Sequence, residues 1–126
     1  MLGSAAPIAF LPSTDLDRSR RFFADRLGLA VAEVTPFACV FRAGTTMLRV
    51  TKVEQLRAQP FTVFGWEVPD IHATVTDLAG AGITCVRYDG VEQDAAGVWT
   101  TPGGDRVAWF RDPDGNTLSL TQFVAR

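Results

Sequence analysis

The stretch that decides the fold runs from Trp109 to Phe123 and reads Trp-Phe-Arg-Asp-Pro-Asp-Gly-Asn-Thr-Leu-Ser-Leu-Thr-Gln-Phe. Two apolar runs of strand-forming residues flank its central segment, Asp112 to Asn116. Within that segment, Pro113 presets φ for the first turn position, and Gly115 can adopt a positive φ. The stretch therefore predicts a strand, a tight turn and a second strand.

The second of these strands has one apolar and one polar face. Leu118 and Leu120 alternate with small polar residues, and successive side chains of a strand point to opposite faces. We expect Trp109 to lie opposite Ser119 on the polar face, and Phe110 to pack with Leu118 on the other. A polar face must meet either water or a ligand, so its surroundings are the functional question.

The composition bounds the class of protein before any motif does. The chain has 126 residues, 47% of them hydrophobic and 21% charged, with a net charge of −2. The length predicts one domain, or two small fused halves that share a core, and the composition is typical of a globular protein. The net charge disfavours nucleic acid as a partner. No apolar run has membrane-spanning length, and no charged N-terminal region leads into an apolar one, so we expect a cytoplasmic protein without a membrane partner. Cys39 and Cys85 lie in apolar runs and are expected to be buried free thiols.

The first half of the chain predicts one strand, one helix and three more strands. A strand is expected from 7 to 12, and Asp15 is a suitable N-cap for a helix that ends at Leu27 and Gly28. Three strands are then expected at 30–34, 37–42 and 46–53. The polar segment 54–60 ends in a proline and is interpreted as a linker.

The second half repeats this order. A strand is expected from 61 to 68, Asp70 caps a helix that runs through Leu78, and Gly82 follows it. Further strands are expected at 83–87, 98–101 and 106–110, ahead of the final strand. The repeat lies in the element order and in the helix caps, because the side chains of the two halves match poorly.

The element order predicts an α+β fold made of two tandem βαβββ modules, about 7–53 and 61–123. A four-stranded sheet covered by one helix leaves its other face apolar and open to water. Two such modules can bring their open faces together as a curved eight-stranded mixed sheet around a cleft, with the helices on the convex side. Concave junctions of this kind favour small-molecule sites.

Several motifs resemble the glyoxalase, bleomycin-resistance and extradiol-dioxygenase superfamily, which has the vicinal oxygen chelate (VOC) fold. They are the duplicated β-α-β-β-β order, Phe110-Arg-Asp-Pro-Asp-Gly-Asn-Thr-Leu118, and Asp15-Leu-Asp-Arg-Ser19 running into Phe22-Phe23 and Leu27-Gly28-Leu29. The resemblance covers about residues 7 to 123. It implies the fold but not the reaction, because members share the scaffold and differ in chemistry.

The resemblance also implies where a metal would be bound. Enzymes of the superfamily typically hold a divalent ion between the halves, with His, Glu or Gln ligands from the first and last strands of each half. The matching residues here are Ile8, Arg49, Val63 and Ser119. Two aliphatic chains, a guanidinium and a hydroxyl lack the carboxylate, imidazole or thiolate ligands that such an ion needs. The only histidine, His72, is predicted on the outside of the second helix, so we expect neither a metal site nor a cofactor.

Strand alternation predicts the side chains that line the cleft. Glu67 shares the inner face of its strand with Val63, and Arg49 of the first half is its expected partner. This pair either binds a polar end of a ligand or holds the halves in register. The tryptophans either stack on a flat ligand or fill the core. The candidate ligand-binding residues are Phe10, Arg49, Glu67, Trp99, Trp109 and Ser119.

Three functions follow from these residues, and sequence alone leaves enzyme and binding protein both open. The first is a metal-free small-molecule binding protein of the glyoxalase/bleomycin-resistance type, which holds an aromatic or amphipathic ligand. The alternative is a metal-independent lyase or isomerase that uses Glu67 as base and Arg49 to stabilise an oxyanion. A metal-dependent glyoxalase or dioxygenase ranks last. A homodimer is expected, because members of the superfamily commonly pair and a sheet edge favours pairing.

Overall fold

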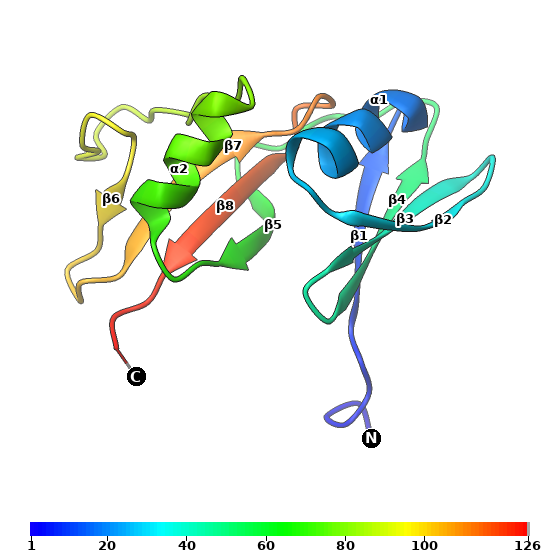
Figure 1. The fold of residues 1–126 in the computed structure, drawn as a ribbon, viewed down its shortest axis with the longest axis horizontal. Helices are drawn as coiled ribbons and strands as arrows, with labels where there is room; N and C mark the ends of the chain where they lie inside the picture. The colour runs from blue at the N-terminus through cyan, green and yellow to red at the C-terminus, as the bar shows by residue number, and fades with distance from the viewer. Residues whose placement is uncertain (126) are drawn as a thin grey trace. The chain divides into compact units, whose positions relative to one another are not determined.

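The computed structural model describes residues 1–125, which fold as two compact units. Unit 1 comprises Met1–Arg57, and unit 2 begins at Ala58, so the boundary lies within the segment interpreted as a linker. Each unit has the order β-α-β-β-β, and Figure 1 shows the two sets of elements. The prediction of two tandem βαβββ modules is therefore confirmed. Neither helical region of the described chain has the length and hydrophobicity of a membrane span.

Unit 1 contains one four-stranded mixed sheet, called sheet A, in the order β1-β4-β3-β2. Strand β1 runs parallel to β4, and the other neighbours are antiparallel. The elements are β1 (Ile8–Ser13), α1 (Leu16–Arg20), the π-helical turn η1 (Arg21–Arg26), β2 (Ala30–Val34), β3 (Ala38–Ala43) and β4 (Thr46–Lys52).

The helix of unit 1 follows the predicted signals and adds a π turn. The Asp15 side chain accepts a hydrogen bond from the Arg18 amide and caps α1. In η1 a backbone hydrogen bond spans five residues instead of the four of an α-helix, because the Leu27 amide donates to the Phe22 carbonyl. Phe22 and Phe23 are both buried, and the Phe23 ring lies 5.5 Å from that of Phe41 in the sheet. The π turn lets two consecutive aromatic residues enter one core.

Unit 2 contains a second four-stranded mixed sheet, sheet B, in the order β5-β8-β7-β6. Strand β5 runs parallel to β8, and the other pairs are antiparallel. Helix α2 packs on β7 and β8. The elements are β5 (Thr62–Glu67), α2 (Ile71–Gly80), β6 (Trp99–Thr100), β7 (Arg106–Arg111) and β8 (Thr117–Gln122).

The turn between β7 and β8 has the conformation that its sequence predicts. Gly115 has a φ of +86°, and its amide donates to the Asp112 carbonyl. One Asp112 carboxylate oxygen accepts from the Asp114 and Asn116 amides, and the other accepts from the Asn116 side chain at 2.8 Å. Burial raises the pKa of Asp112, and these hydrogen bonds oppose the rise. The turn sets the register that pairs Trp109 with Ser119 and Phe110 with Leu118, as predicted.

Two parts of the prediction are wrong. Residues 83–87 form no strand, because only the Val86 amide reaches β7, where it donates to the Trp109 carbonyl. The side chain of Gln93 bonds the Val86 carbonyl and the Tyr88 amide instead. The strands also form two separate four-stranded sheets rather than one of eight, because every ladder among residues 1–125 joins strands of the same unit. The cleft between the halves stays a prediction.

Candidate functional site

The open face of sheet B, opposite α2, carries most of the predicted site residues. Trp109 and Gly65 flank Ser119 on neighbouring strands, and Glu67 and Val107 flank Thr121 in the same way. Trp99 pairs with Val107 and therefore shares this face. The helix-facing side is different, because there the Trp66 ring stacks on Phe110 at 5.9 Å. Trp66, which is half-buried, therefore packs on the helix-facing side of the sheet.

Three aromatic rings cluster on the open face of sheet B. The indoles of Trp99 and Trp109 stack with their centroids 6.1 Å apart and an interplanar angle of 21°. The Tyr88 ring meets Trp109 edge-on at 5.2 Å and 86°. All three side chains are half-buried, so part of each ring is accessible. We call Tyr88, Trp99 and Trp109 the aromatic cluster.

Small side chains lie beside the aromatic cluster. A side chain at Gly65 would collide with the Ser119 hydroxyl and with its backbone oxygen, so β5 can pass Ser119 only with glycine. The Ser119 hydroxyl makes no hydrogen bond within the described part of unit 2 and can donate to or accept from a ligand. Glu67 lies farther along β5, and its side chain is exposed. The face thus combines flat apolar rings, a free hydroxyl and a carboxylate.

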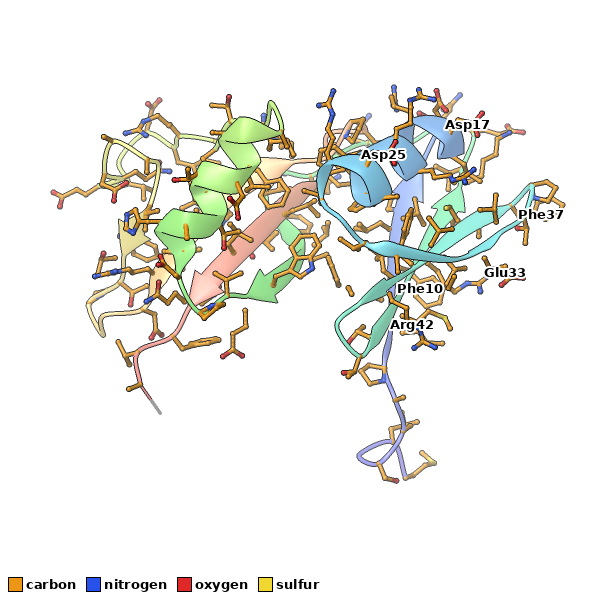
Figure 2. All side chains as sticks on the ribbon, in the orientation of Figure 1. Phe10, Asp17, Asp25, Glu33, Phe37 and Arg42 are labelled. Atoms are coloured by element: carbon orange, nitrogen blue, oxygen red, sulfur yellow. The ribbon has the colours of Figure 1, made fainter. Side chains whose placement is uncertain are left out.

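In unit 1, the structure brings Phe10 and Arg49 together. They are direct partners across β1 and β4 on the open face of sheet A, and Val40 pairs with Arg49 on its other side. Phe10 is 60% exposed and projects from β1, as Figure 2 shows. Arg49 forms no hydrogen bond or ion pair within unit 1, so its guanidinium can bind an anionic or polar group. Its pairing with Glu67 in unit 2 stays a prediction.

The residues at the metal-ligand positions do not suit a metal. Ile8 is 48% exposed on β1, Val63 is 43% exposed at an irregularity in β5, and neither offers a donor atom. Arg49 and Ser119 supply a cation and a neutral hydroxyl. No group of three His, Cys, Asp or Glu side chains that could hold a metal occurs among residues 1–125. This donor set does not fit a divalent ion.

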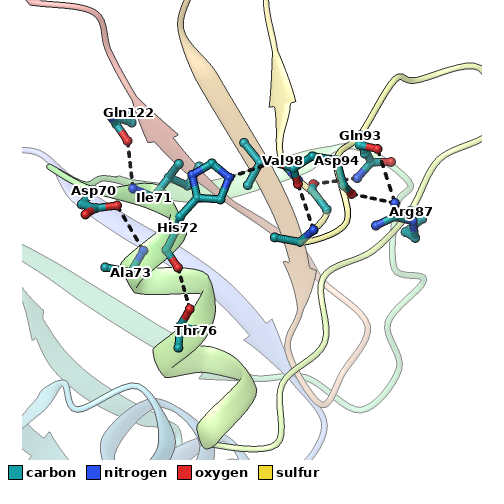
Figure 3. Close-up of polar contacts among 12 residues, drawn as sticks. Asp70, Ile71, His72, Ala73, Thr76, Arg87, Gln93, Asp94, Val98 and Gln122 are labelled. Atoms are coloured by element: carbon teal, nitrogen blue, oxygen red, sulfur yellow. Dashed lines mark hydrogen bonds and ion pairs between the residues drawn. The ribbon is translucent and has the colours of Figure 1, made fainter.

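His72 lies in the first turn of α2, as predicted, but it also has a partner. Its Nε2 donates to Asp94 Oδ2 at 2.8 Å, and the two side chains are 44% and 45% exposed. This bond is the largest cause of the lowered pKa of Asp94, and the Val98 and Ala96 amides lower it further. Figure 3 shows His72 reaching across to the segment that contains Asp94.

A cavity of about 330 Å³ opens in unit 1 beside the first turn of α1. Its lining includes Asp15, Asp17, Arg20, Lys52 and Cys39, and none of the predicted site residues. Burial raises the pKa of the Cys39 thiol, and the nearby Arg20 only partly opposes this. The thiol is therefore protonated at neutral pH and is not a nucleophile. Both cysteines are free, and Cys39 is buried as predicted, whereas Cys85 is only half-buried.

The sequence model of the Glyoxalase/Bleomycin resistance protein/Dioxygenase superfamily matches residues 5–120. The chain belongs to this superfamily. No curated protein matches it. Among solved structures, it is similar to a bleomycin resistance determinant encoded on the transposon Tn5, with 22% identity, a TM-score of 0.76, and 97% of this chain and 100% of that one covered.

Two further structures of the superfamily illustrate its range. Lactoylglutathione lyase from Agrobacterium tumefaciens is 21% identical, with a TM-score of 0.74 and 95% of each chain covered. A glyoxalase/bleomycin resistance protein/dioxygenase from Alicyclobacillus acidocaldarius is 16% identical, with a TM-score of 0.72 and 97% and 93% of the two chains covered. At these identities the superfamily fold is shared, and the function must be argued from the site.

Three residues in and beside the aromatic cluster could not be placed from the sequence. Tyr88, at the end of the strand predicted at 83–87, was a possible hydroxyl donor to a ligand with its direction left open, and Gln93 and Asp94 were only part of a predicted polar loop. Strand alternation cannot place them, because they lie in an irregular segment whose shape depends on side-chain hydrogen bonds. A glutamine and an aspartate in a loop with several glycines were the only available signals.

Proposed function

We propose that this chain is a metal-free small-molecule binding protein of the glyoxalase/bleomycin-resistance type. The observation that carries the proposal is the stacked pair of Trp99 and Trp109 on the open face of sheet B. The ligand is a flat aromatic or amphipathic molecule that stacks on these indoles. Ser119 and Glu67 bind its polar groups, and Phe10 and Arg49 are the candidate ligand-binding residues of unit 1.

The energetics of stacking support a binding role. A well-placed aromatic pair contributes about 0.5–1.5 kcal/mol beyond the area it buries, so two indoles can give a flat ligand substantial affinity. Gly65 has no side chain and Ser119 has a small one, so no bulky group stands beside the rings on this face of the sheet. If these tryptophans were core residues, other side chains would cover their rings, but both indoles are half-exposed.

Tryptophan fluorescence tests the proposal directly. Riboflavin, quercetin and quinine serve as planar probes, with correction for inner-filter absorption. We expect at least one to quench the emission saturably, and Trp109→Leu to weaken its binding about two- to twelvefold, which corresponds to the stacking energy above. The matched control is Trp66→Leu, on the helix-facing side, which leaves the affinity unchanged if far-ultraviolet circular dichroism shows a folded protein. Equal affinities of the wild type and Trp109→Leu would contradict the proposal.

The metal-free state has its own test. Protein purified without added metal is expected to contain much less than one equivalent of divalent ion by elemental analysis. Addition of Zn²⁺, Ni²⁺ or Mn²⁺ should leave the melting temperature unchanged, because the donor set offers no competent ligands. One tightly bound ion per chain would refute a metal-free protein.

The second candidate is a metal-independent lyase or isomerase with Glu67 as general base. It is favoured by one observation, namely that Glu67 shares the open face with Ser119 and the indole pair. Glu67 is exposed, however, and an exposed carboxylate lacks the dry surroundings that tune such a base. Glu67→Gln discriminates the two functions, because it abolishes turnover of an enzyme substrate but changes the affinity of a binding protein only modestly.

A further inference from the structure

An irregular segment between α2 and β6 builds one side of the aromatic cluster. This segment, residues 81–98, contains no strand or helix and carries Tyr88 toward β7. The Val86 amide donates to the Trp109 carbonyl at 2.7 Å, so the segment runs alongside β7 just before Tyr88. Such a segment keeps one conformation only if its polar backbone groups find partners.

Gln93 supplies those partners from a single side chain. Its Nε2 donates to the carbonyls of Val86 and Gly97, both at 2.9 Å, and its Oε1 accepts from the Tyr88 amide at 2.8 Å. The backbone of Gln93 also forms an isolated bridge with Trp99. One amide group therefore joins the strand-like residues before Tyr88 to the residues that lead into Trp99.

Asp94 and Gly97 also stabilise the conformation of this segment. One Asp94 carboxylate oxygen accepts from the Ala96 and Val98 amides, and the Asp94 carbonyl accepts from Arg87 Nη2 at 2.7 Å, as Figure 3 shows in part. Gly97 has a φ of +93°, and a side chain there would come within 2.8 Å of Cys85 Cβ. The backbone at residue 97 can approach Cys85 this closely only because residue 97 is glycine.

The hydroxyl of Tyr88 takes no part in these hydrogen bonds. The ring packs edge-on against Trp109, yet its Oη makes no hydrogen bond among residues 1–125. A tyrosine hydroxyl usually finds a protein partner when it is buried, but Tyr88 is only half-buried, so its hydroxyl can bond to water or to a ligand. A tyrosine held rigidly beside two accessible indoles, with a free hydroxyl, is suited to contact a bound ring at its edge.

We propose that Tyr88 is a ligand-binding residue whose hydroxyl donates a hydrogen bond to an acceptor on the edge of a stacked aromatic ligand, and that Gln93 is the residue that positions it. The ligand class is thereby narrowed to planar rings that carry an acceptor such as a ring nitrogen or a carbonyl oxygen. This inference rests on the proposed aromatic binding function.

Quinoline and naphthalene test the hydroxyl, because they have the same shape and differ by one ring nitrogen. Binding is followed by the indole N–H resonances of the tryptophans in NMR. We expect the wild type to bind quinoline about three- to tenfold more tightly than naphthalene, as one additional hydrogen bond allows. Tyr88→Phe keeps the ring and should remove this preference, with naphthalene affinity unchanged.

A double-mutant cycle tests the positioning role of Gln93. Gln93→Met keeps the side-chain length and removes all three hydrogen bonds, so it should reduce the preference for quinoline and change the near-ultraviolet circular dichroism of the free protein. Glu92→Met, at the exposed neighbouring position, is the matched control and should change neither. In the Gln93→Met background, Tyr88→Phe should have almost no further effect on quinoline binding, because the two residues act as one unit.

The outcomes separate this inference from the proposed function. Binding of both probes with equal affinity, or a quinoline preference that survives in Tyr88→Phe, would overturn the role of Tyr88 and leave aromatic binding intact. Additive effects of Gln93→Met and Tyr88→Phe would overturn the positioning role. If the wild type binds neither probe but does bind riboflavin, quercetin or quinine, the inference alone is overturned. If it binds none of the five molecules, both the inference and the function on which it rests are overturned.

Discussion

At the scale of single residues, Gly65 shows how closely two strands of sheet B approach. A Cβ at this position would lie 2.9 Å from the Ser119 backbone oxygen and would also collide with the Ser119 hydroxyl. The parallel strands β5 and β8 therefore depend on glycine at this point, beside the proposed ligand-binding residues.

Gly65→Ala is expected to lower the free energy of unfolding by about 1–3 kcal/mol, because backbone atoms must move to admit the methyl group. Chemical denaturation measures the change. The control is Gly80→Ala in α2, where no atom lies within 4 Å of the added Cβ and the helix gains up to about 1 kcal/mol. Changes of the same sign in both variants would contradict the steric explanation.

The hydrogen bond between Asp94 and His72 makes a prediction about pH. The hydrogen bond from His72 is the main reason that the Asp94 pKa lies below its ordinary value of 3.8. A carboxylate with a lowered pKa stabilises the folded state above its unfolded pKa and loses that contribution as the pH falls through the folded value. The stabilisation is therefore present above about pH 4 and disappears below it.

Asp94→Asn should accordingly be less stable than the wild type at pH 6 by about 1 kcal/mol or less, because both side chains of the pair are partly exposed. The difference should shrink toward zero in urea titrations taken down to pH 2.5. His72→Ala removes the main cause of the lowered pKa and should flatten the same part of the profile. A wild-type advantage that is independent of pH would show that the charge of Asp94 is not responsible.

At the scale of elements, the two helices begin in the same way. Asp15 and Asp70 have nearly identical extended conformations, with φ of −147° and −145°, and each accepts a hydrogen bond from the amide three residues later. In unit 2 the Gln122 side chain also accepts from the Ile71 amide, so β8 contributes to the start of α2. The duplicated caps are the local origin of the repeat.

Replacement of either cap should weaken its own unit. Asp15→Ala and Asp70→Ala are each expected to lower the free energy of unfolding by about 1 kcal/mol, because one helix amide loses its acceptor. Asp15→Asn and Asp70→Asn keep an acceptor and serve as controls that should be nearly neutral in thermal and chemical denaturation. If the Asn variants are as unstable as the Ala variants, the charge and not the hydrogen bond is the cause.

At the scale of the whole molecule, both sheets have edge strands with exposed apolar side chains. Strand β1 is an edge of sheet A and exposes Ile8 and Phe10, and β5 is an edge of sheet B and exposes Val63. Exposed apolar edges favour association, so we expect the chain to form a homodimer.

Sedimentation velocity at micromolar concentration should therefore give twice the mass of one chain. Ile8→Lys is expected to shift the distribution toward monomer, because a buried lysine at an interface must lose its hydration. Asp25→Lys, on the exposed side of η1, changes the charge in the same direction and should leave the mass unchanged. A monomer at all concentrations would rule out the homodimer.

The sequence by itself determined the features that depend on neighbours along the chain. The caps at Asp15 and Asp70, the positive φ of Gly28, Gly82 and Gly115, and the pairing of Trp109 with Ser119 all follow from local conformational preferences and from alternation within strands. These features were enough for the tandem βαβββ order, and for placing Trp109, Ser119 and Glu67 on one face of a sheet.

Only the tertiary structure decided what depends on contacts between distant segments. The strand predicted at 83–87 does not form, because the Gln93 side chain satisfies backbone groups that would otherwise need a neighbouring strand. The same Gln93 side chain bonds the Tyr88 amide, and the Tyr88 ring lies against Trp109. The periodicity of apolar residues in the sequence could not predict this contact. The sequence also left open whether the eight strands join in one sheet or in two, because backbone hydrogen bonds between strands carry no sequence signal of their own.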